Sequence, residues 1–440
     1  MTDSITSVHA RQVLDSRGQP TVEVEVHCGS AMGRAIVPSG ASTGKHEALE
    51  LRDGDPDDYA GKSVRKAVAN VQQILAPAIV RMPASEQAGI DRKLCELDGT
   101  PDKSRLGANA ILGVSLACAH AAAAVRGQPL WQYLDRAGRA RMPLPMVNLI
   151  SGGLHAGRNL DMQDFLLLPI GANSYSEALH MTSRVYRALS VTLQEHGHEG
   201  VLVGDEGGFG PKLAGNEQAI ELILQAFRRA GLHPNRDAAI AIDVASTHFF
   251  EGASPPLSPV LGGEGLGVRG LYRLKDQLLS ATMMSAMLTD WADHYPILSI
   301  EDGMAEDDWT GWKTLTESLG QRVQLIGDDL FATNPDRLKR GIEAGVANSV
   351  LIKVNQIGTL TETLAVIEQA RTAGYRCVVS ARSGETEDST IADLAVATGV
   401  GQIKIGSITR SERLAKYNQL LRIEEQMGPG APFAKWKGIA

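Results

Sequence analysis

The chain has 440 residues and a formal net charge of −8 at pH 7. Nucleic-acid binding needs a concentrated positive field, and the basic residues here occur only in short groups, so this class of protein is disfavoured. Hydrophobic residues make up 43% of the sequence and charged residues 21%, a composition typical of a globular protein with a substantial core. The length fits two or three domains, or one large barrel with a smaller domain.

The cysteines and the chain start indicate the compartment. The four cysteines are scattered and form no CxxC pair, which fits neither a disulfide framework nor a thiolate zinc site and favours a reducing compartment. Residues 1–7 lack the basic and apolar regions of a signal peptide, and the longest run of small apolar residues, 116–125, is too short to span a bilayer. We therefore expect a cytoplasmic, soluble protein without a membrane partner.

The first part of the chain has strands followed by helices. Residues 21–28 alternate valine with glutamate, which predicts a half-buried strand, and a second short strand at 33–37 makes a meander. The small, polar loop 37–44 follows and is predicted to be mobile. Residues 57–126 have a helical pattern.

The alanines and glycines of residues 107–125 allow close helix packing. We predict an α+β domain over residues 1–141, which ends before the proline pair Pro143 and Pro145.

The second part, residues 142–440, alternates short apolar runs with amphipathic segments. Several runs, among them 201–205, lead directly to a charged residue. These charged residues are Glu206, Asp243, Glu301, Asp328, Lys353, Arg382 and Lys404. From Glu301 onward they lie 22 to 29 residues apart, the length of one strand, one helix and two loops. The spacing predicts a (β/α)8-type barrel behind the smaller α+β domain.

Three of these residues, Asp243, Glu301 and Asp328, are carboxylates at the predicted ends of neighbouring strands. The carboxyl ends of the strands of a β/α barrel converge on the active site. Carboxylates packed together are costly without a cation. Oxygen ligands without Cys or His favour Mg²⁺ or Mn²⁺ over zinc, so the sequence predicts a divalent metal site.

Two lysines follow in the same pattern. Lys353, near both a metal and Lys404, is expected to have a lowered proton affinity, which suits a general base. Glu206 is then the candidate for the general acid. A lysine that faces a carboxylic acid across a metal-bound substrate suits removal of a proton next to a carboxylate, with the metal stabilising the resulting ene-diolate.

Longer motifs resemble those of the enolase (phosphopyruvate hydratase) family along nearly the whole chain. Residues 204–209 read Gly-Asp-Glu-Gly-Gly-Phe, and residues 351–358 read Leu-Ile-Lys-Val-Asn-Gln-Ile-Gly. Further matching motifs lie at residues 10–18, 37–44, 47–54, 299–302, 327–330, 382–386 and 413–419. Motifs of this length and number are highly specific.

The resemblance implies the reversible dehydration of 2-phosphoglycerate to phosphoenolpyruvate, a step of glycolysis, with two Mg²⁺ sites. It implies Asp243, Glu301 and Asp328 as ligands of the first Mg²⁺. Ser42, in a lid loop over residues 37–44, joins the second Mg²⁺ when substrate binds. Lys353 takes the C2 proton and Glu206 helps the C3 hydroxyl leave. The resemblance implies Arg382 and Ser383 as phosphate contacts and Lys404 as the lysine near the carboxylate. His155 and Gln163 are other implied substrate-side residues, and Asp164 belongs to the shell around the departing hydroxyl.

The sequence departs from the family pattern on the leaving-group side. Ala381 replaces a histidine, and no histidine follows His294. Asp164 replaces a glutamate and is one methylene shorter. The other nearby differences are Ser151 for asparagine, His248 for glutamate, Gly303 for proline and Ile405 for threonine.

Three interpretations therefore stay open. The first is an ordinary enolase. The second is an enolase-like paralogue that acts on a related phosphorylated or phosphonate three-carbon acid, similar to carboxyphosphonoenolpyruvate synthase. The third is a non-catalytic enolase-fold binding protein, against which the retained Lys353 and Glu206 count. The resemblance also implies a homodimer or an assembly of dimers, with a small phosphorylated carboxylate as substrate.

Overall fold

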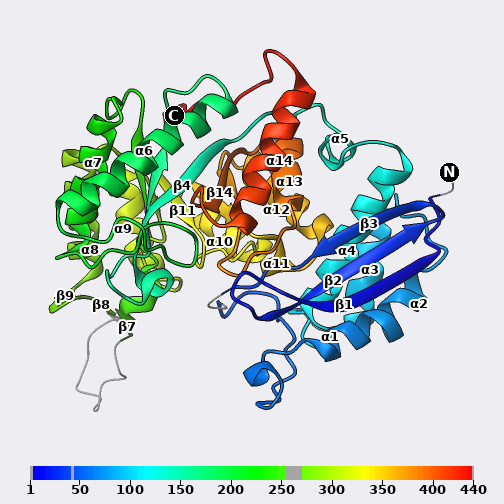
Figure 1. Cartoon of the computed structure of the whole chain (residues 1–440). Helices are drawn as coiled ribbons and strands as arrows, with labels where there is room; N and C mark the ends of the chain where they lie inside the picture. The colour runs from blue at the N-terminus through cyan, green and yellow to red at the C-terminus, as the bar shows by residue number, and fades with distance from the viewer. Residues whose placement is uncertain (1–2, 41–43, 253–269, 439–440) are drawn as a thin grey trace, which may run out of the picture.

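The computed structural model describes residues 3–40, 44–252 and 270–438. A small sheet with helices packed on it lies beside a closed barrel, and the blue-to-cyan first third of the chain forms the small part (Figure 1). The predicted architecture, a β/α barrel preceded by a smaller α+β domain, is confirmed. The division between residues 141 and 142 stays a prediction, and residues 41–43 of the predicted loop lie outside the described residues.

The N-terminal sheet is antiparallel, in the order β1 (Ser7–Leu14), β2 (Pro20–Cys28) and β3 (Ala31–Ile36). The predicted meander corresponds to β2 and β3, and β1 adds a strand that the sequence pattern did not reveal. The valines of β2 are fully buried. On the opposite face, Glu23 and Glu25 form ion pairs with Arg11 of β1, so the alternation of valine and glutamate separates a core face from a charged face.

The helices of this domain pack against the valine face of the sheet. Their bounds are η1 (Tyr59–Gly61), α1 (Arg65–Asn70), the π-helix η2 (Val71–Leu75), α2 (Ala76–Ile79), α3 (Gln87–Asp98), α4 (Ala108–Val125) and α5 (Leu130–Leu134). Among the described residues, α4 alone is long and apolar enough to cross a membrane, and 83% of it is buried inside the protein. This burial identifies α4 as a core helix.

The barrel closes in the order β4, β5, β6, β10, β11, β12, β13 and β14, with β14 paired to β4. Its strands are β4 (Leu144–Ser151), β5 (Asp164–Leu168), β6 (Ala239–Asp243), β10 (Ile297–Glu301), β11 (Gln324–Gly327), β12 (Ser349–Ile352), β13 (Arg376–Ser380) and β14 (Gly401–Gly406). Neighbouring strands are parallel except around β5, which pairs antiparallel with both β4 and β6.

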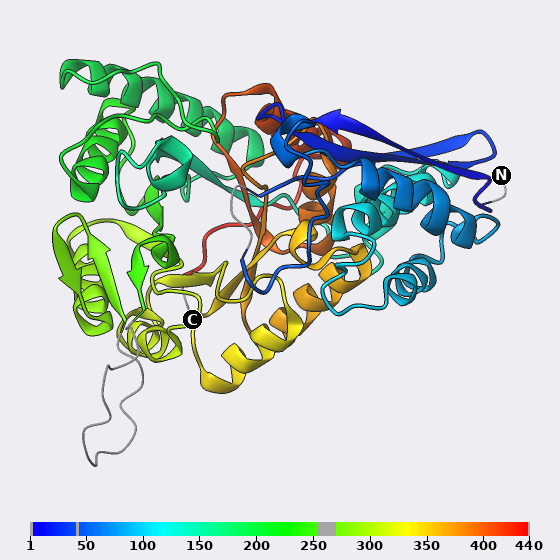
Figure 2. The same ribbon diagram turned by 90° about the horizontal axis from the view of Figure 1, so that it is seen from below.

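Helices surround the barrel, as Figure 2 shows from below. They are α6 (Tyr175–Glu195), α7 (Asn216–Arg229), α8 (Ala281–His294), α9 (Trp309–Leu319), α10 (Pro335–Ala344), α11 (Val354–Ile357), α12 (Leu360–Thr372), α13 (Thr390–Thr398) and α14 (Ser411–Met427). Two short 3₁₀ helices and a small sheet complete the structure: η3 (Gly153–Ala156), η4 (Ser246–Phe249), β7 (Phe250–Glu251), β8 (Leu271–Leu274) and β9 (Gln277–Leu279).

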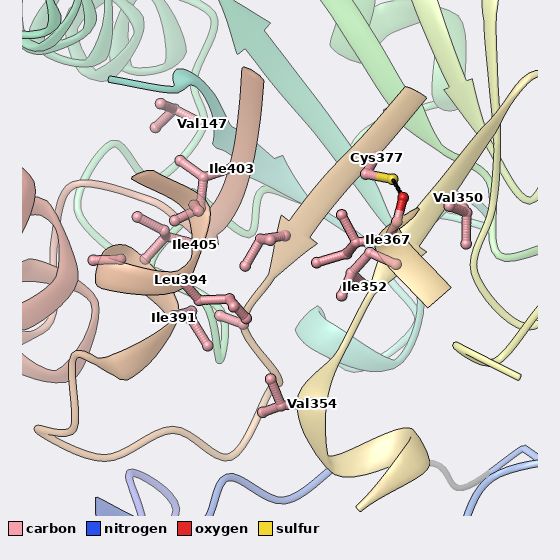
Figure 3. Close-up of a cluster of buried hydrophobic side chains, with 14 of the residues drawn as sticks. Val147, Val350, Ile352, Val354, Ile367, Cys377, Ile391, Leu394, Ile403 and Ile405 are labelled. Carbon is pink, nitrogen blue, oxygen red and sulfur yellow. Dashed lines mark hydrogen bonds between the residues drawn. The ribbon is translucent and has the colours of Figure 1, made fainter. Parts of the chain in front are cut away.

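The hydrophobic core has a layer inside the barrel and a larger layer outside it. The inner layer consists of Met146, Leu166, Leu168, Ala239, Ala241, Ile326, Leu351 and Val378. Figure 3 shows part of the outer layer, where Ile352 of β12 and Cys377 of β13 lie near Ile367 of α12. The Cys377 thiol donates to the Ile367 carbonyl at 3.9 Å, and the four cysteines are free.

The two domains contact each other through helices. α11, α12 and α13 of the barrel pack against α4, α3 and α5 of the N-terminal domain, respectively. Both views place these contacts on the side of the barrel that faces the N-terminal sheet (Figures 1 and 2). The N-terminal domain is thereby held next to the strand ends of the barrel, where it supplies side chains to the site described below.

Candidate functional site

A pocket lies at the carboxyl ends of the barrel strands, and Glu47 from the N-terminal domain forms part of its wall. Its lining consists of Glu47, Leu154, His155, Gln163, Glu206, Asp243, Ala245, His248, Asp302, Asp328, Asp329, Lys353, Ser380, Ala381, Arg382, Ser383 and Lys404. Asp164 and Glu301 lie behind this lining and bond to residues in it. The structure therefore brings together all the site residues predicted from sequence except Ser42, which lies outside the described residues.

The three predicted carboxylates do converge. Asp243 is the last residue of β6, Glu301 is the last residue of β10, and Asp328 directly follows β11. Asp243 and Glu301 are register partners on neighbouring parallel strands. Burial raises the pKa of Glu301 well above its usual value, and the charge of Asp243 raises it further. The site thus concentrates negative charge in a buried place.

Two lysine side chains pair with these negatively charged carboxylates. Lys404 Nζ donates to Asp243 Oδ2 and to both Glu301 oxygens, each at 2.8 Å. Lys353 Nζ donates to Asp328 Oδ2. Burial lowers the pKa of Lys353, but the charges of Asp328 and Glu301 together outweigh burial and raise it; the lowering expected next to a bound metal stays a prediction.

A compact acidic group lies next to these carboxylates. One oxygen from each of Asp302, Asp328 and Asp329 lies within 4.8 Å of the others. Burial raises the pKa of Asp329 to about 7, with the charge of Asp328 adding to the effect. Ionising such a cluster is costly without a cation, and its donors are all carboxylates, so these residues fit a hard divalent metal ion.

Sequence reasoning missed Asp302 and Asp329 as members of the site. The carboxylate of Asp302 accepts the backbone N–H groups of Asp328 at 2.9 Å and Asp329 at 2.8 Å. Asp302 therefore fixes the loop that carries Asp328. The signal was present, since each missed residue directly follows a predicted ligand in the sequence.

A second group forms on the opposite wall. His155 Nδ1 bonds to Asp164 Oδ2 at 2.9 Å, and His155 Nε2 lies 3.9 Å from Glu206 Oε1. Burial opposes a charge on His155, but Asp164 and Glu206 outweigh burial and raise its pKa to about 9. The imidazole is therefore a cation at neutral pH, held between two carboxylates.

The departures Asp164 and Ser151 contact each other. Ser151 Oγ donates to Asp164 Oδ1 at 3.1 Å, and Asn148 Nδ2 donates to the same oxygen. All three side chains are fully buried. The short carboxylate of Asp164 is thus satisfied by short polar partners and by His155. On the same wall, Gln163 Nε2 donates to Asp243 Oδ2 at 3.2 Å.

The phosphate-side residues predicted from sequence follow β13. Arg382 Nη1 donates to Glu47 Oε2 at 3.0 Å and to Asn355 Oδ1 at 2.8 Å. Ser383 Oγ accepts from Arg17 Nη1 at 3.5 Å. Glu47, Asn355 and Arg17 lie within matching sequence motifs, but a linear pattern does not show that they meet Arg382 and Ser383.

Ala381 and His248 both line the pocket. Ala381 is 5% exposed, and its N–H donates to the Lys404 carbonyl at 2.9 Å, so the main chain keeps the barrel pairing here. Within the described part of the chain, the imidazole of His248 has no hydrogen-bond partner, and burial lowers its pKa. His155 and His248 are the histidines of the described pocket lining.

One predicted strand is wrong. Residues 201–205 do not form a barrel strand; Val201 and Leu202 are 67% and 61% exposed, and Val203 makes only an isolated bridge to Phe209. Glu206 reaches the pocket from this loop, where its backbone C=O accepts from Ser407 N at 2.8 Å. Its position was predicted for the wrong structural reason.

A β/α barrel with carboxylates and lysines converging at its strand ends, joined to a small α+β domain, has the architecture of a barrel enzyme whose site lies at the carboxyl ends of the strands. Two family models cover nearly the whole chain: the enolase N-terminal domain matches residues 5–134, and the enolase C-terminal TIM barrel domain matches residues 139–439. The chain belongs to the enolase family.

Proposed function

We propose that this protein is an Mg²⁺-dependent enolase that interconverts 2-phosphoglycerate and phosphoenolpyruvate. The observation that carries the proposal is the pairing of two lysines with three strand-end carboxylates in one pocket. Buried lysines and carboxylates cost stability, and such clusters concentrate at active sites, so this arrangement favours an enzyme over a binding protein.

Asp243, Glu301 and Asp328 are the residues that would hold the first Mg²⁺, with Ser42 joining a second one together with substrate. When bound, Mg²⁺ would stabilise the negative charge that develops on the substrate carboxylate. Lys404, which contacts Asp243 and Glu301, lies where it can pair with that carboxylate. The ions, their number and these roles are proposals for this chain.

Lys353 is proposed as the base that takes the C2 proton. It must be neutral to do so, and the Asp328 carboxylate, which raises its pKa, opposes this. Base activity therefore requires that the charge of Asp328 be neutralised by another cation. This requirement ties proton abstraction to the occupied site and prevents Lys353 from acting as a base in the protein alone.

Glu206 and His155 are proposed to act together at the leaving hydroxyl. Burial raises the pKa of Glu206, but His155 and Arg413 outweigh burial and lower it. Glu206 alone is thus ionised at neutral pH, whereas His155 carries a proton. His155 Nε2 lies 3.9 Å from Glu206 Oε1, so the imidazolium would pass its Nε2 proton to Glu206, and Glu206 would then deliver that proton to the departing C3 hydroxyl.

The test is the ultraviolet absorbance of phosphoenolpyruvate when purified protein meets 2-phosphoglycerate and Mg²⁺, with a chelator as control. A rapid, chelator-sensitive rise is expected. No rise, together with solvent-deuterium exchange at C2, would mean that the base works but that the native leaving group differs. The absence of both signals would leave the non-catalytic interpretation.

A second candidate function is favoured by Ala381 and Asp164: an enolase-like paralogue for a related phosphorylated or phosphonate three-carbon acid. Ala381 lies in the pocket wall and lacks the imidazole of the family, and Asp164 lies behind the wall with a carboxylate one methylene shorter. The two candidates differ in what an imidazole at position 381 would do, because only a hydroxyl leaving group needs that extra donor.

Replacing Ala381 with histidine tests this difference. If the protein is an enolase, Ala381→His is expected to raise kcat for 2-phosphoglycerate by roughly tenfold, because a further proton donor then faces the leaving group. Ala381→Leu has similar bulk without a titratable nitrogen and serves as the control. An unchanged or lower rate in the histidine variant would support the paralogue.

The remaining proposals concern the cellular location and the oligomeric state of the protein. We propose a cytoplasmic location and a homodimer or assembly of dimers, on the resemblance to the family. Light scattering of the purified protein measures the assembly directly, and a monomer at micromolar concentration would contradict the proposed dimer.

A further inference from the structure

Arg382 and Glu47 form a buried ion pair that joins the barrel to the N-terminal domain. Their side chains are 5% and 4% exposed. Both terminal nitrogens of Arg382 engage the carboxylate: Nη1 lies 3.0 Å from Glu47 Oε2, and Nη2 lies 3.3 Å from Glu47 Oε1. Asn355 Oδ1 accepts a further bond from Nη1 at 2.8 Å. Both terminal nitrogens of the Arg382 guanidinium are thus occupied by the carboxylate of Glu47.

The same carboxylate has two other partners. Glu47 Oε1 accepts from Gly44 N at 3.2 Å and from Gln356 Nε2 at 3.3 Å. Gln356 Nε2 also donates to Asp328 Oδ1 at 3.1 Å. Glu47 therefore connects the backbone of the segment that begins at Gly44, the arginine on the phosphate side and a strand-end carboxylate.

We propose that Glu47 is the internal counter-ion of Arg382, which the phosphate group of a ligand must displace. The inference rests on the proposed function, which assigns Arg382 to the substrate phosphate. A phosphate binds a guanidinium through the same two nitrogens that Glu47 occupies, and two anions at one fork repel each other.

Displacement selects for charge. A monoanionic ligand gains nothing over the monoanionic Glu47 carboxylate at this fork, whereas a phosphate dianion forms stronger charge-assisted hydrogen bonds. The cost of displacing Glu47 is the same for every anion, so only a ligand whose own bonds to Arg382 exceed that cost binds well, and a dianion meets this condition more readily than a monoanion. It acts through Arg382 and is a positioning and specificity residue, without contact to the reacting atoms.

The experiment is a calorimetric titration with inorganic phosphate at a fixed Mg²⁺ concentration. Glu47→Gln keeps the shape and hydrogen-bonding oxygen but removes the competing charge. We expect it to bind phosphate roughly tenfold more tightly than the unchanged protein. Glu362→Gln is the matched control, because Glu362 also pairs with a buried cation, Lys103, at 3.0 Å but lies outside the pocket lining. Its phosphate affinity is expected to stay unchanged.

Kinetic measurements distinguish two roles of Glu47: competing with the substrate phosphate for Arg382, or orienting Arg382 for the ligand. Glu47→Gln is expected to lower KM for 2-phosphoglycerate severalfold with no rise in kcat. Weaker phosphate binding in this variant would overturn the proposal, because it would mean that Glu47 orients Arg382 for the ligand. Undetectable phosphate binding by both proteins would overturn it as well.

A second measurement uses the unchanged protein, so that the proposal can be tested even if Glu47→Gln does not fold. Displacement of Glu47 releases the hydrogen bond to Gly44 N, so exchange of the Gly44 amide, followed in a peptide over residues 38–52, is expected to speed up at saturating phosphate. Unaltered exchange there would refute displacement. If the phosphate results hold but 2-phosphoglycerate is not turned over, the role of Glu47 stands and the proposed function fails.

Discussion

Lys353 can act as a base only after it has lost its own proton, so its pKa limits proton abstraction in this pocket. Its ammonium group is bound by Asp328, and burial does not free it of its proton. Replacing Lys353 with alanine is therefore expected to lower solvent-deuterium exchange at C2 of 2-phosphoglycerate by at least about 100-fold, since general bases contribute on this scale. Mass spectrometry of the recovered substrate measures the exchange.

The control for this prediction is Lys339→Ala on α10, an exposed lysine far from the pocket lining. It is expected to exchange at the rate of the unchanged protein. Exchange that persists in Lys353→Ala would show that another group takes the proton.

The site residues found from sequence share one property. Asp243 and Glu301 end parallel strands, and the topology of a β/α barrel brings such ends together regardless of their distance in sequence. Glu47 and Asn355 both bond to Arg382, and Glu47 reaches it from the other domain only through the packing of the domains, which no local pattern encodes. Their roles required the structure.

At the scale of elements, the contact between β3 and α4 depends on Gly33. A Cβ at this position would overlap with the main chain of Ala117 and Ala121, which the helix cannot move without losing its own hydrogen bonds. The alternation of small residues on β3 and the alanine-rich α4 explain why sheet and helix approach so closely. This contact confirms the close packing predicted for residues 107–125.

Gly33→Ala is therefore expected to lower the free energy of unfolding by about 1–3 kcal/mol, the usual cost of overpacking a rigid contact. Urea unfolding followed by circular dichroism measures it. Gly252→Ala, at a glycine where an added Cβ meets no atom of the described residues within 4 Å, is expected to change stability little. Equal effects of the two substitutions would contradict a close contact at Gly33.

Two errors in the strand prediction, the missed strand β5 and the strand wrongly predicted at residues 201–205, have physical explanations. β5 runs opposite to its neighbours, so its first residue, Asp164, faces the site instead of its last one. A search for charges at the ends of apolar runs cannot find such a strand. Residues 201–205 are apolar and resemble a strand, but they lie exposed in a loop, because exposure depends on tertiary packing and not on composition.

At the scale of the whole molecule, Asp393 of α13 joins both domains. Its Oδ1 accepts from Trp131 N of α5 at 3.1 Å, and its Oδ2 accepts from Gln419 Nε2 of α14 at 3.1 Å. Burial raises the pKa of Asp393 from 3.8 to about 6. Between these pH values the folded protein binds more protons than the unfolded chain, so stability falls as the pH rises through about 6.

Asp393→Asn is expected to raise the melting temperature at pH 8 and to leave it nearly unchanged at pH 4. The gain at pH 8 corresponds to about 1–3 kcal/mol, because the variant avoids a buried negative charge while its oxygen still accepts from Trp131. Calorimetry at the two pH values measures this difference. Asp276→Asn, at an exposed position, is the control, and a gain of equal size at both pH values would rule out titration of Asp393 as the cause.

The reversal of β5 has a consequence for how this protein can diverge. Because β4 and β5 form one hairpin, the segment 144–168 carries Ser151, His155, Gln163 and Asp164, whereas Asp243, Glu301 and Asp328 come from separate strands. Selection can therefore alter several leaving-group residues within one contiguous stretch of the gene, while the distant codons for the three strand-end carboxylates stay untouched. New substrates are expected to arise through clustered substitutions in this hairpin.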